Sequence, residues 1–568
     1  MNIRTRTMTE PPLIQDWLER QSAAAGFFPA HPQDGEAYRE LSRDVDRRFT
    51  REQRGELAQL LEGGGPHARS RVDRFIREDG FVVTTGQQPV LFGGPLFVLY
   101  KALTAVALAH RLEALLDRPV LPVFWVASED HDWEEARQVS LLDQQNQLRS
   151  PALEEREGPA AALHRIGLET PLAEGAEENR VPPGHGLEKA LKLLLDSLPD
   201  SDFAGEWTGM ISDAWQPGTT LPAAFTQALA RLLGDDGLFF IQSHASLLRT
   251  LSRPILAREL QDSQELGAAL VERAQALESA GFTPQVPILE GATNVFLDAP
   301  ESRERILVDP DGGFRLRSSN RNLSASEING ALQGEDGKWI SPNVLLRPVV
   351  EAHILPTLAY VAGPGEASYL AQTAPLFEAH DVHRPLVYPR FSGDVLEGKV
   401  QKVLEKFDLD LEALATPHHE LASRIARDEV PPSIRKEVGS FRGMLARHTA
   451  QLQDAVSDLD PTLGPPVLQL KSQGFAQLDE VEKKVTQALK RENQIALAQL
   501  SKAQDHLFPG GLPQERGMSF WYYLFRYGPA FLEEIRREVA SRPNRIGAAA
   551  RGAITAKSDP GLSQSPGR

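Results

Sequence analysis

The chain has 568 residues, a net charge of −17 at pH 7, a pI near 5.4 and no cysteine. The acidic balance argues against a nucleic-acid partner, which normally requires a basic face, and the absence of cysteine excludes disulfides, thiolate metal sites and a thiol nucleophile. An apolar content of 41% is enough for a sizeable core.

No segment of the sequence predicts membrane insertion. Residues 1–20 lack the apolar stretch of a secretory signal. The apolar window 89–109 holds a single charge, Lys101, and its break at Gly93-Gly94-Pro95 leaves a helix too short to cross a bilayer. We therefore expect a soluble, cytoplasmic protein without a membrane partner.

Residues 81–143 have the pattern of the first half of a Rossmann-like core. The short β-branched and aromatic runs at 81–85 and 120–127 are typical of parallel strands buried on both faces. The apolar segment 96–116 between them predicts a right-handed crossover helix. The fold class we predict is α/β, with a Rossmann-like parallel sheet, α+β insertions and a C-terminal antiparallel α-helical coiled coil.

The rest of the chain divides by changes in composition and periodicity. Residues 286–289, 294–297 and 306–308 predict short strands in a small insertion. Residues 251–277 and 367–380, which lie outside that insertion, each predict one helix. The predicted segments are 1–80, a helical lead-in; 81–143, the first half of the core; 144–236, a helical and loop-rich insertion; 237–281, a continuation of the core; 282–346, a small α+β insertion; 347–393, the second half of the core; 394–508, a coiled coil; 509–540, an aromatic docking segment; and 541–568, a disordered tail.

The coiled-coil prediction for 394–508 depends on apolar residues that alternate spacings of about three and four, with charged residues between them. Breakers at Asp460-Pro461 and Gly464-Pro465-Pro466 predict that the helices fold back as an antiparallel hairpin. The cluster Phe520-Trp521-Tyr522-Tyr523 predicts a segment that docks this arm on the body.

Glycine and polar residues follow the first predicted strand and precede the helix. A helix N-terminus with bare backbone amides favours a phosphate or carboxylate, although a tight turn without a ligand is about equally expected. Lys101, on the helix, could extend out of the core, but we favour a contact with a phosphate or carboxylate. The candidate anion-binding residues here are Thr85, Gly86, Gln87, Gln88, Gly93 and Gly94.

The second predicted strand ends in four titratable residues, Glu129-Asp130-His131-Asp132. Neighbouring like charges separate pKa values and can provide a base near neutral pH. The cluster could coordinate Mg²⁺ through Asp130 and Asp132, bind a substrate ammonium, or act as general base. An acidic cap for the following helix is the alternative, and the two roles are compatible.

The second half of the core repeats the arrangement of strand, turn and helix at Gly363-Pro364-Gly365-Glu366. Its glycines permit close approach to a nucleotide, and Glu366 could bind a ribose hydroxyl or an amine. Arg347 and Arg390 are candidate anion ligands, although a structural ion pair is the commoner role of such arginines.

The carboxyl ends of parallel strands lie at one edge of a sheet, where ligands bind in this architecture. Both the Thr85–Gln88 loop and the acidic loop follow such ends. We therefore predict that the two loops line one cleft.

These motifs resemble the bacillithiol biosynthesis family BshC over most of the chain and in the same order. The residues that carry the resemblance are Thr85-Gly86-Gln87-Gln88-Pro89 with Gly94-Pro95-Leu96; Pro122-Val123-Phe124-Trp125-Val126-Ala127-Ser128-Glu129-Asp130-His131-Asp132; Arg347-Pro348; Ala362-Gly363-Pro364-Gly365-Glu366; and Leu507-Phe508-Pro509-Gly510-Gly511 with Gln514-Glu515-Arg516.

The resemblance implies a Rossmann-like, nucleotidyltransferase-like core and an ATP-dependent ligase that joins the carboxyl of cysteine to the amine of glucosaminyl malate, giving bacillithiol. It also implies ATP as the source of acyl activation, with ADP as a candidate product and Mg²⁺ as a candidate metal, and a homodimer formed through the coiled coil. The helix N-terminus, Lys101 and an arginine would hold phosphates, and the Glu129–Asp132 cluster would hold a metal or the amine and remove its proton.

The sequence departs from adenylate-forming enzymes of this fold, because Phe97-Val98-Leu99-Tyr100-Lys101 stands where a His-x-Gly-His motif is expected. An acyl adenylate and an acyl phosphate therefore both stay open. Two rival functions are an amino-acid-activating nucleotidyltransferase with another substrate and a non-catalytic nucleotide-binding dimer.

Overall fold

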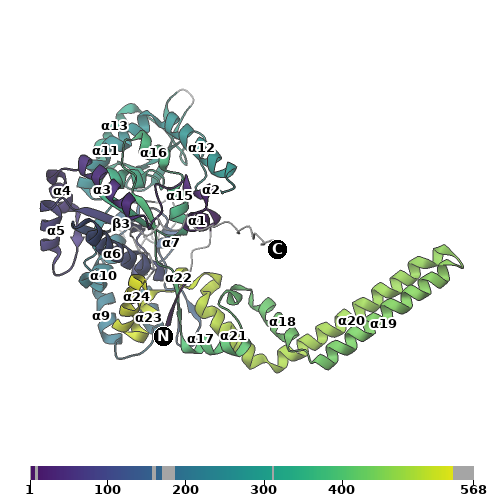
Figure 1. The fold of residues 1–568 in the computed structure, drawn as a ribbon. Helices are drawn as coiled ribbons and strands as arrows, with labels where there is room; N and C mark the ends of the chain where they lie inside the picture. Colours follow the sequence, from purple (N-terminus) through teal and green to yellow (C-terminus); the bar gives the residue numbers. More distant parts are fainter. Residues whose placement is uncertain (1, 7–10, 156–160, 169–185, 310–311, 542–568) are drawn as a thin grey trace, which may run out of the picture. The chain divides into compact units, whose positions relative to one another are not determined.

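The computed structural model describes residues 2–6, 11–155, 161–168, 186–309 and 312–541 (Figure 1). They form two compact units: a smaller one of residues 2–4, 145–148 and 394–517, and a larger one that contains the described residues of 5–144 and 149–393 and the helices after 518. The predicted tail 541–568 lies outside the described residues, apart from Ser541. No helix among the described residues is long and apolar enough to cross a membrane.

A six-stranded sheet forms the centre of the larger unit, in the order β14-β13-β3-β4-β7-β2. All neighbours are parallel except β2, which is antiparallel to β7. The strands are β2 (Glu62–Gly63), β3 (Phe81–Gln87), β4 (Val120–Val126), β7 (Phe239–Gln242), β13 (Thr357–Ala362) and β14 (Leu386–Pro389). This confirms the predicted Rossmann-like sheet. The chain moves outward in opposite directions from β3 and β13, so the edge beyond their carboxyl ends is the expected ligand site.

Helices cover both faces of the sheet, as its alternating side chains require. Phe81 and Val83 pack in one apolar cluster with Ala105 and Leu108 of α6 (Leu96–Leu116), whereas Val82 packs in the other. Helix α24 (Pro529–Ser541) contacts α6 (Figure 1). The N-terminal helices are α1 (Pro12–Leu18), α2 (Ser22–Ala25), α3 (Gly35–Arg48), α4 (Arg51–Leu57) and α5 (Ala68–Arg77), and those between β4 and β7 are α7 (Trp133–Ala136), α8 (Leu187–Ser197), α9 (Ala204–Ala214) and α10 (Leu221–Leu232).

Two predicted helices are broken in the structure. The prediction for 251–277 corresponds to α11 (Ser246–Gln261) and α12 (Ser263–Ser279), which separate at Asp262. The prediction for 367–380 corresponds to α15 (Pro364–Leu370) and α16 (Ala374–Ala379), and Pro375 lies in the first turn of α16, where its missing N–H costs nothing. Helix α14 (Arg347–Ile354) precedes β13.

The α+β insertion carries an antiparallel sheet of order β11-β10-β9-β8-β12. Its elements are β8 (Ala292–Asp298), β9 (Arg303–Val308), β10 (Phe314–Leu316), β11 (Asn322–Leu323), α13 (Ala325–Gln333) and β12 (Trp339–Pro342). The strand predicted at 286–289 is wrong. The backbone N–H and C=O of Val286 bond instead to the side chain of Gln372, both at 2.9 Å, so they join no strand.

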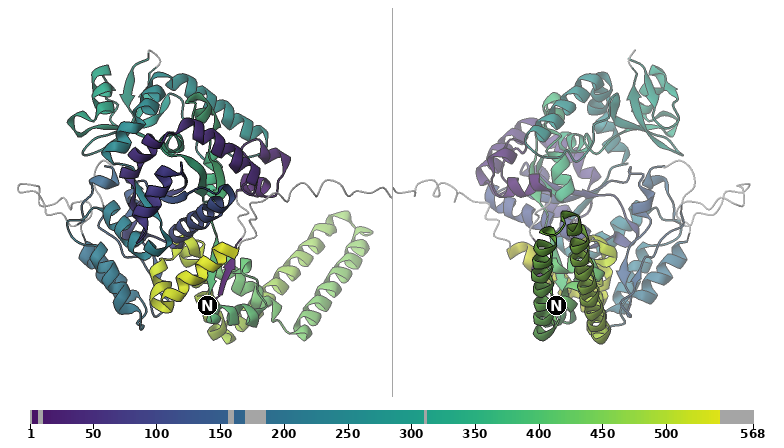
Figure 2. Two further views of the ribbon diagram at one scale, coloured as in Figure 1. Left: turned by 60° about the vertical axis from the view of Figure 1, so that its left-hand side comes forward. Right: turned by 90° about the vertical axis from the view of Figure 1, so that its right-hand side faces the viewer.

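The smaller unit is helical, and its hairpin of α19 (Pro432–Ser457) and α20 (Gly464–Glu492) confirms the predicted antiparallel pair. Figure 2 shows these two helices side by side in both views. The other helices of this unit are α17 (Gly398–Phe407), α18 (His418–Asp428), α21 (Gln494–Leu507) and α22 (Gln514–Gly517). The aromatic cluster 520–523 of the predicted docking segment lies in α23 (Phe520–Tyr527), which is buried within the larger unit, where the Trp521 indole donates to the carbonyl of Phe92 at 2.8 Å.

Candidate active site

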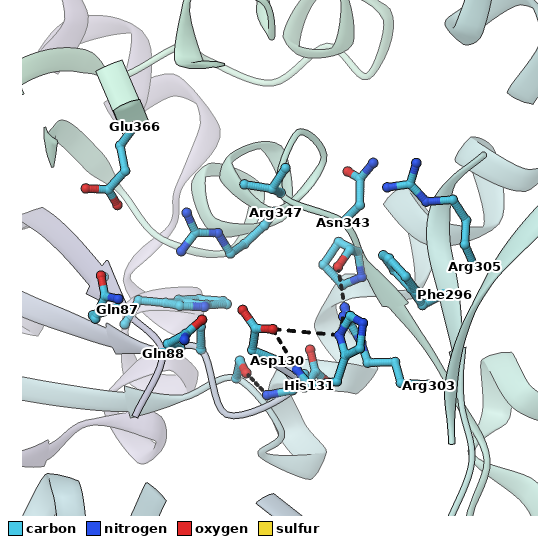
Figure 3. A pocket seen from close by; sticks show the side chains of 17 residues that line it. Gln87, Gln88, Asp130, His131, Phe296, Arg303, Arg305, Asn343, Arg347 and Glu366 are labelled. Atoms are coloured by element: carbon cyan, nitrogen blue, oxygen red, sulfur yellow. Dashed lines mark hydrogen bonds and ion pairs between the residues drawn. The ribbon is translucent and has the colours of Figure 1, made fainter. Parts of the chain in front are cut away.

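A pocket of about 300 Å³ lies at the carboxyl ends of β3 and β4 (Figure 3). The α+β insertion and the start of α14 supply its other wall. It is lined by Gly86, Gln87, Gln88, Trp125, Ala127, Glu129, Asp130, His131, Ser243, Phe296, Arg303, Arg305, Pro342, Asn343, Val344, Arg347 and Glu366.

The two loops predicted to share a cleft do line this pocket. Gly86 and Gln87 pair in register with Trp125 and Val126, and the Ala127 N–H donates to the Gln87 carbonyl at 3.0 Å. Because both strands end at the same level, the residues that follow them emerge side by side.

Gly86 allows a close approach between the sheet and Arg347. A Cβ atom at this position would lie 3.1 Å from Nη1 of Arg347 and 3.0 Å from the Trp125 carbonyl oxygen. The guanidinium group donates to the hydroxyls of Tyr369 at 2.6 Å and Tyr360 at 3.1 Å. Arg347 is therefore fixed against the floor of the pocket before any ligand binds.

Lys101 lies beneath the floor and does not line the pocket. Its ammonium is 2.6 Å from Oε2 of Glu366 and donates to the Gly86 carbonyl at 2.7 Å and to Oε1 of Gln87 at 3.0 Å. These three acceptors match the three N–H groups of a lysine. Burial lowers the pKa of Lys101 to about 8, and Glu366 opposes that shift.

Glu366, which does line the pocket, belongs to the same buried network. Its carboxylate also accepts from the Gly363 N–H at 2.8 Å and from the Tyr360 hydroxyl at 3.1 Å. The network therefore joins α6, β13 and α15 directly behind the Gly86 turn, and it connects Lys101 to Arg347 through Tyr360.

The acidic loop presents Glu129 and Asp130 to the pocket. Burial raises the pKa of Glu129 to about 7, while Arg249, whose Nε lies 3.2 Å from Oε1 of Glu129, opposes the shift. Oδ1 of Asp130 accepts from the backbone N–H groups of His131 and Asp132 at 2.6 and 3.2 Å. Asp132 caps α7 by accepting from the N–H of Glu135 at 3.1 Å, which is the capping role that the sequence allowed for one of these acids.

Residues behind the acidic loop fix its shape. The Ser128 hydroxyl lies 2.7 Å from Nδ1 of His244, and the His244 ring stacks on His164 with 4.7 Å between centroids. Burial, followed by the charge of Arg249, lowers the pKa of His164 to about 3 and that of His244 to about 4. Both rings are therefore neutral near pH 7, which suits their position beside a cation.

The α+β insertion contributes pocket residues that the sequence reasoning missed, chiefly Phe296, Arg303, Arg305 and Asn343. Arg303 and Arg305 both lie over the Phe296 ring, with Cζ 4.1 and 5.2 Å from its centroid. The sequence does contain a signal for these two arginines: the alternation Arg303-Glu304-Arg305 places both of them on one face of a strand.

Two family models match nearly the whole chain: the bacillithiol biosynthesis BshC N-terminal Rossmann-like domain over residues 1–391, and the BshC C-terminal coiled-coil domain over residues 394–542. The chain belongs to the BshC family. It is similar to proteins named "Putative cysteine ligase BshC" from Salinibacter ruber (32% identical over 93% of this chain and 94% of the relative), Prosthecochloris aestuarii (30%, over 92% and 96%) and Chlorobaculum tepidum (30%, over 90% and 90%). The resemblance predicted from the motifs is confirmed.

In this BshC family member, several predicted anion ligands lie outside the pocket. Gly93 and Gly94 adopt φ values of +82° and +79°, and a Cβ atom at Gly93 would lie 2.7 Å from the Phe520 ring. The first N–H of α6, that of Leu96, donates to the Met518 carbonyl at 2.9 Å. The remaining residues of this group are Thr85, which donates to the Val361 carbonyl, Gly363, Gly365 and the buried Arg390.

The described pocket residues of this BshC family member suit an anion better than a resident metal ion. No group of three or more His, Cys, Asp or Glu side chains converges on a metal position in the described part of the chain, and Asp132 does not reach the pocket. Three arginines could instead hold the phosphates or carboxylates of a bound substrate. The volume is at the lower end of the range of about 300–1,000 Å³ for small-molecule sites.

Proposed function

We propose that this chain is a cytoplasmic, ATP-dependent ligase that forms an amide bond between the carboxyl group of cysteine and the amino group of glucosaminyl malate. The observation that carries the proposal is the meeting of Glu129, whose pKa is raised to about 7, with three arginines in one pocket. Membership of the bacillithiol biosynthesis family BshC and the relatives' name of cysteine ligase support ligase activity and cysteine as one substrate.

Amide formation requires an uncharged amine, and Glu129 is suited to provide it. A substrate amine reaches the site as an ammonium ion, so a carboxylate must accept a proton before or during attack on the acyl carbon. A base with a pKa near the working pH combines a useful deprotonated fraction with adequate proton affinity. Glu129 meets this requirement, and Asp130 beside it can hold the ammonium in place.

Arg347 and Arg303 are suited to the negative charge on the other side of the reaction. ATP supplies the leaving group on the cysteine carboxyl, and Mg²⁺ would enter with its phosphates. As the nitrogen–carbon bond forms and the bond to the leaving phosphate or adenylate breaks, charge develops on the leaving oxygen. Guanidinium groups already held in place stabilise that charge with little reorganisation.

We also propose that the α19–α20 hairpin pairs with a second copy of the chain. Its exposed apolar side chains include Phe441, Met444, Leu452, Leu468, Leu470 and Val481. A two-helix hairpin that exposes this many apolar groups favours a partner of the same kind. Light scattering of the intact protein tests this: replacing Phe441 and Met444 with glutamate is expected to convert a dimer to a monomer, and a monomeric wild type would contradict it.

The deciding experiment supplies the purified protein with glucosaminyl malate, cysteine, ATP and Mg²⁺ and follows the thiol product by mass. The expected result is product with the wild type and none with Glu129→Gln. Nucleotide that binds without turnover under every condition would favour a non-catalytic dimer. Pyrophosphate exchange with another amino acid would favour a different activating enzyme.

A further inference from the structure

Arg305 is a half-buried cation in the wall of the pocket. It lies on β9 opposite Phe296 of β8 and lines the pocket. Its guanidinium group makes no hydrogen bond or ion pair within the described residues. Arg303, two residues earlier on the same strand face, donates to Oγ of Ser341, the Pro342 carbonyl and Nδ1 of His131 at 3.1, 2.9 and 3.1 Å.

The surroundings of Arg305 disfavour its charge. Burial lowers its pKa, and the neighbouring cations Arg317 and Arg303 lower it further. Phe296 covers one face of the guanidinium group, with 5.2 Å from Cζ to the ring centroid. A buried or half-buried charge is usually paired within the protein. An anion in the pocket would remove this destabilisation, so the free energy of binding favours a ligand with negative charge at this wall.

The form of the wall favours a carboxylate over a polyphosphate. A guanidinium group binds the two oxygens of a carboxylate side by side. Phe296 supplies an apolar surface for the carbon atoms next to that group. Polyphosphate would bring several negative charges to this wall, whereas a carboxylate brings one, which matches the single guanidinium charge of Arg305.

We propose that Arg305 is the residue that selects an acceptor with a carboxylate-bearing substituent, by binding one carboxylate of a dicarboxylate group against Phe296. This inference rests on the proposed function for the identity of the acceptor, but the binding step can be measured without the reaction. Arg303 and Arg347, which are already held by protein groups, form the rest of the positive wall.

Binding of L-malate to the intact protein, measured by calorimetry without nucleotide or cysteine, tests the subsite. Arg305→Gln is expected to weaken malate binding about tenfold or more, as loss of a charged hydrogen-bonding partner does. The matched control is Arg315→Gln, in the neighbouring strand β10, where the guanidinium group pairs with Asp309 at 2.6 Å away from the pocket. That control is expected to bind malate as the wild type does.

Selectivity and stability provide two further measurements. L-Lactate, which lacks the second carboxylate, is expected to bind the wild type more weakly than malate, and Arg305→Gln should remove most of that difference. Without ligand, the thermal midpoint of Arg305→Gln is expected to equal or exceed that of the wild type, because an unpaired charge is removed.

Wild-type protein that binds no malate at millimolar concentration would overturn the proposal, as would malate affinity that is unchanged in Arg305→Gln. Pyrophosphate that binds at Arg305 in preference to malate would overturn the choice of ligand. Malate binding that depends on Arg305 in a protein that forms no amide product would leave the subsite in place and contradict the proposed ligase function.

Discussion

Arg303 donates a hydrogen bond from Nη1 to Nδ1 of His131 over 3.1 Å. A guanidinium group can donate hydrogen bonds but cannot accept them, so Nδ1 of His131 is the acceptor. Nδ1 therefore carries a lone pair, and the proton of the neutral ring is on Nε2. The two residues are 172 positions apart and come from the core and from the insertion. This bond therefore sets both the orientation of the ring and its tautomer.

We expect His131→Ala to reduce the rate of product formation by about tenfold or more, a loss typical of a displaced positioning group, because His131 lines the pocket beside Asp130. Arg303→Met should reproduce part of that loss, because the ring would no longer be held in one tautomer. The two changes together should cost less than the sum of their separate effects if they act through this bond. The rates of the wild type, the two single variants and the double variant, measured by mass detection of the product, test this coupling. Strictly additive losses would contradict it.

The raised pKa of Glu129 predicts a defined pH dependence of activity. The rate should rise with pH and level off above about 7, because only the carboxylate accepts a proton. Glu129→Gln should remove both the activity and this titration. The matched control Glu134→Gln, on the exposed side of α7, should keep the wild-type profile. A profile that is flat from pH 6 to 8 would exclude Glu129 as the base.

The same group makes stability depend on pH in a known direction. The pKa of Glu129 is raised from 4.5 to about 7, so the folded protein retains a proton that the unfolded chain has released over this interval. The contribution of this proton to the stability of the folded state is therefore fully present below about pH 4.5 and is lost as the pH rises to about 7. Urea unfolding at several pH values should show this loss in the wild type and a smaller loss in Glu129→Gln.

Substitutions in the buried Lys101–Glu366 pair test whether Lys101 has a structural role or binds a ligand. Lys101→Met leaves the carboxylate of Glu366 buried without its cation, which typically costs about 3–5 kcal/mol. The double change Lys101→Met with Glu366→Gln should recover part of this stability, because no unpaired charge stays behind. Urea unfolding measures both effects. If Lys101→Met keeps full stability and loses only nucleotide affinity, Lys101 contacts the phosphate, as the sequence predicted.

Gly86→Ala should disturb Arg347 directly. The added methyl group would lie within about 3 Å of both the guanidinium group and the Trp125 carbonyl, and Arg347 must move because the backbone oxygen cannot. We expect a loss of activity of about tenfold or more, typical for a displaced positioning group. Gly365→Ala is the control, because its Cβ atom would meet nothing within 4 Å, and it should be neutral in both activity and unfolding.

Much of the core could be predicted from local pattern. The buried runs that became β3 and β4, the apolar helix α6 between them and the spacing of the coiled coil are properties of short segments. The meeting of Gly86–Gln88 with the acidic loop also followed from the sequence, because parallel strands of similar length end at one edge. The strand predicted at 286–289 failed because one distant side chain, Gln372, occupies the backbone groups that pairing would need.

The sequence by itself determined the sheet, the helical hairpin and which loops face one another, because hydrophobic periodicity and strand direction act over a few neighbouring residues. Only the tertiary structure decided that Lys101 lies under the pocket floor, that Phe520 covers Gly93, and that the insertion adds Arg303 and Arg305 to the site. Each of these outcomes depends on which distant groups neutralise a charge or fill a space, and no local pattern encodes that choice.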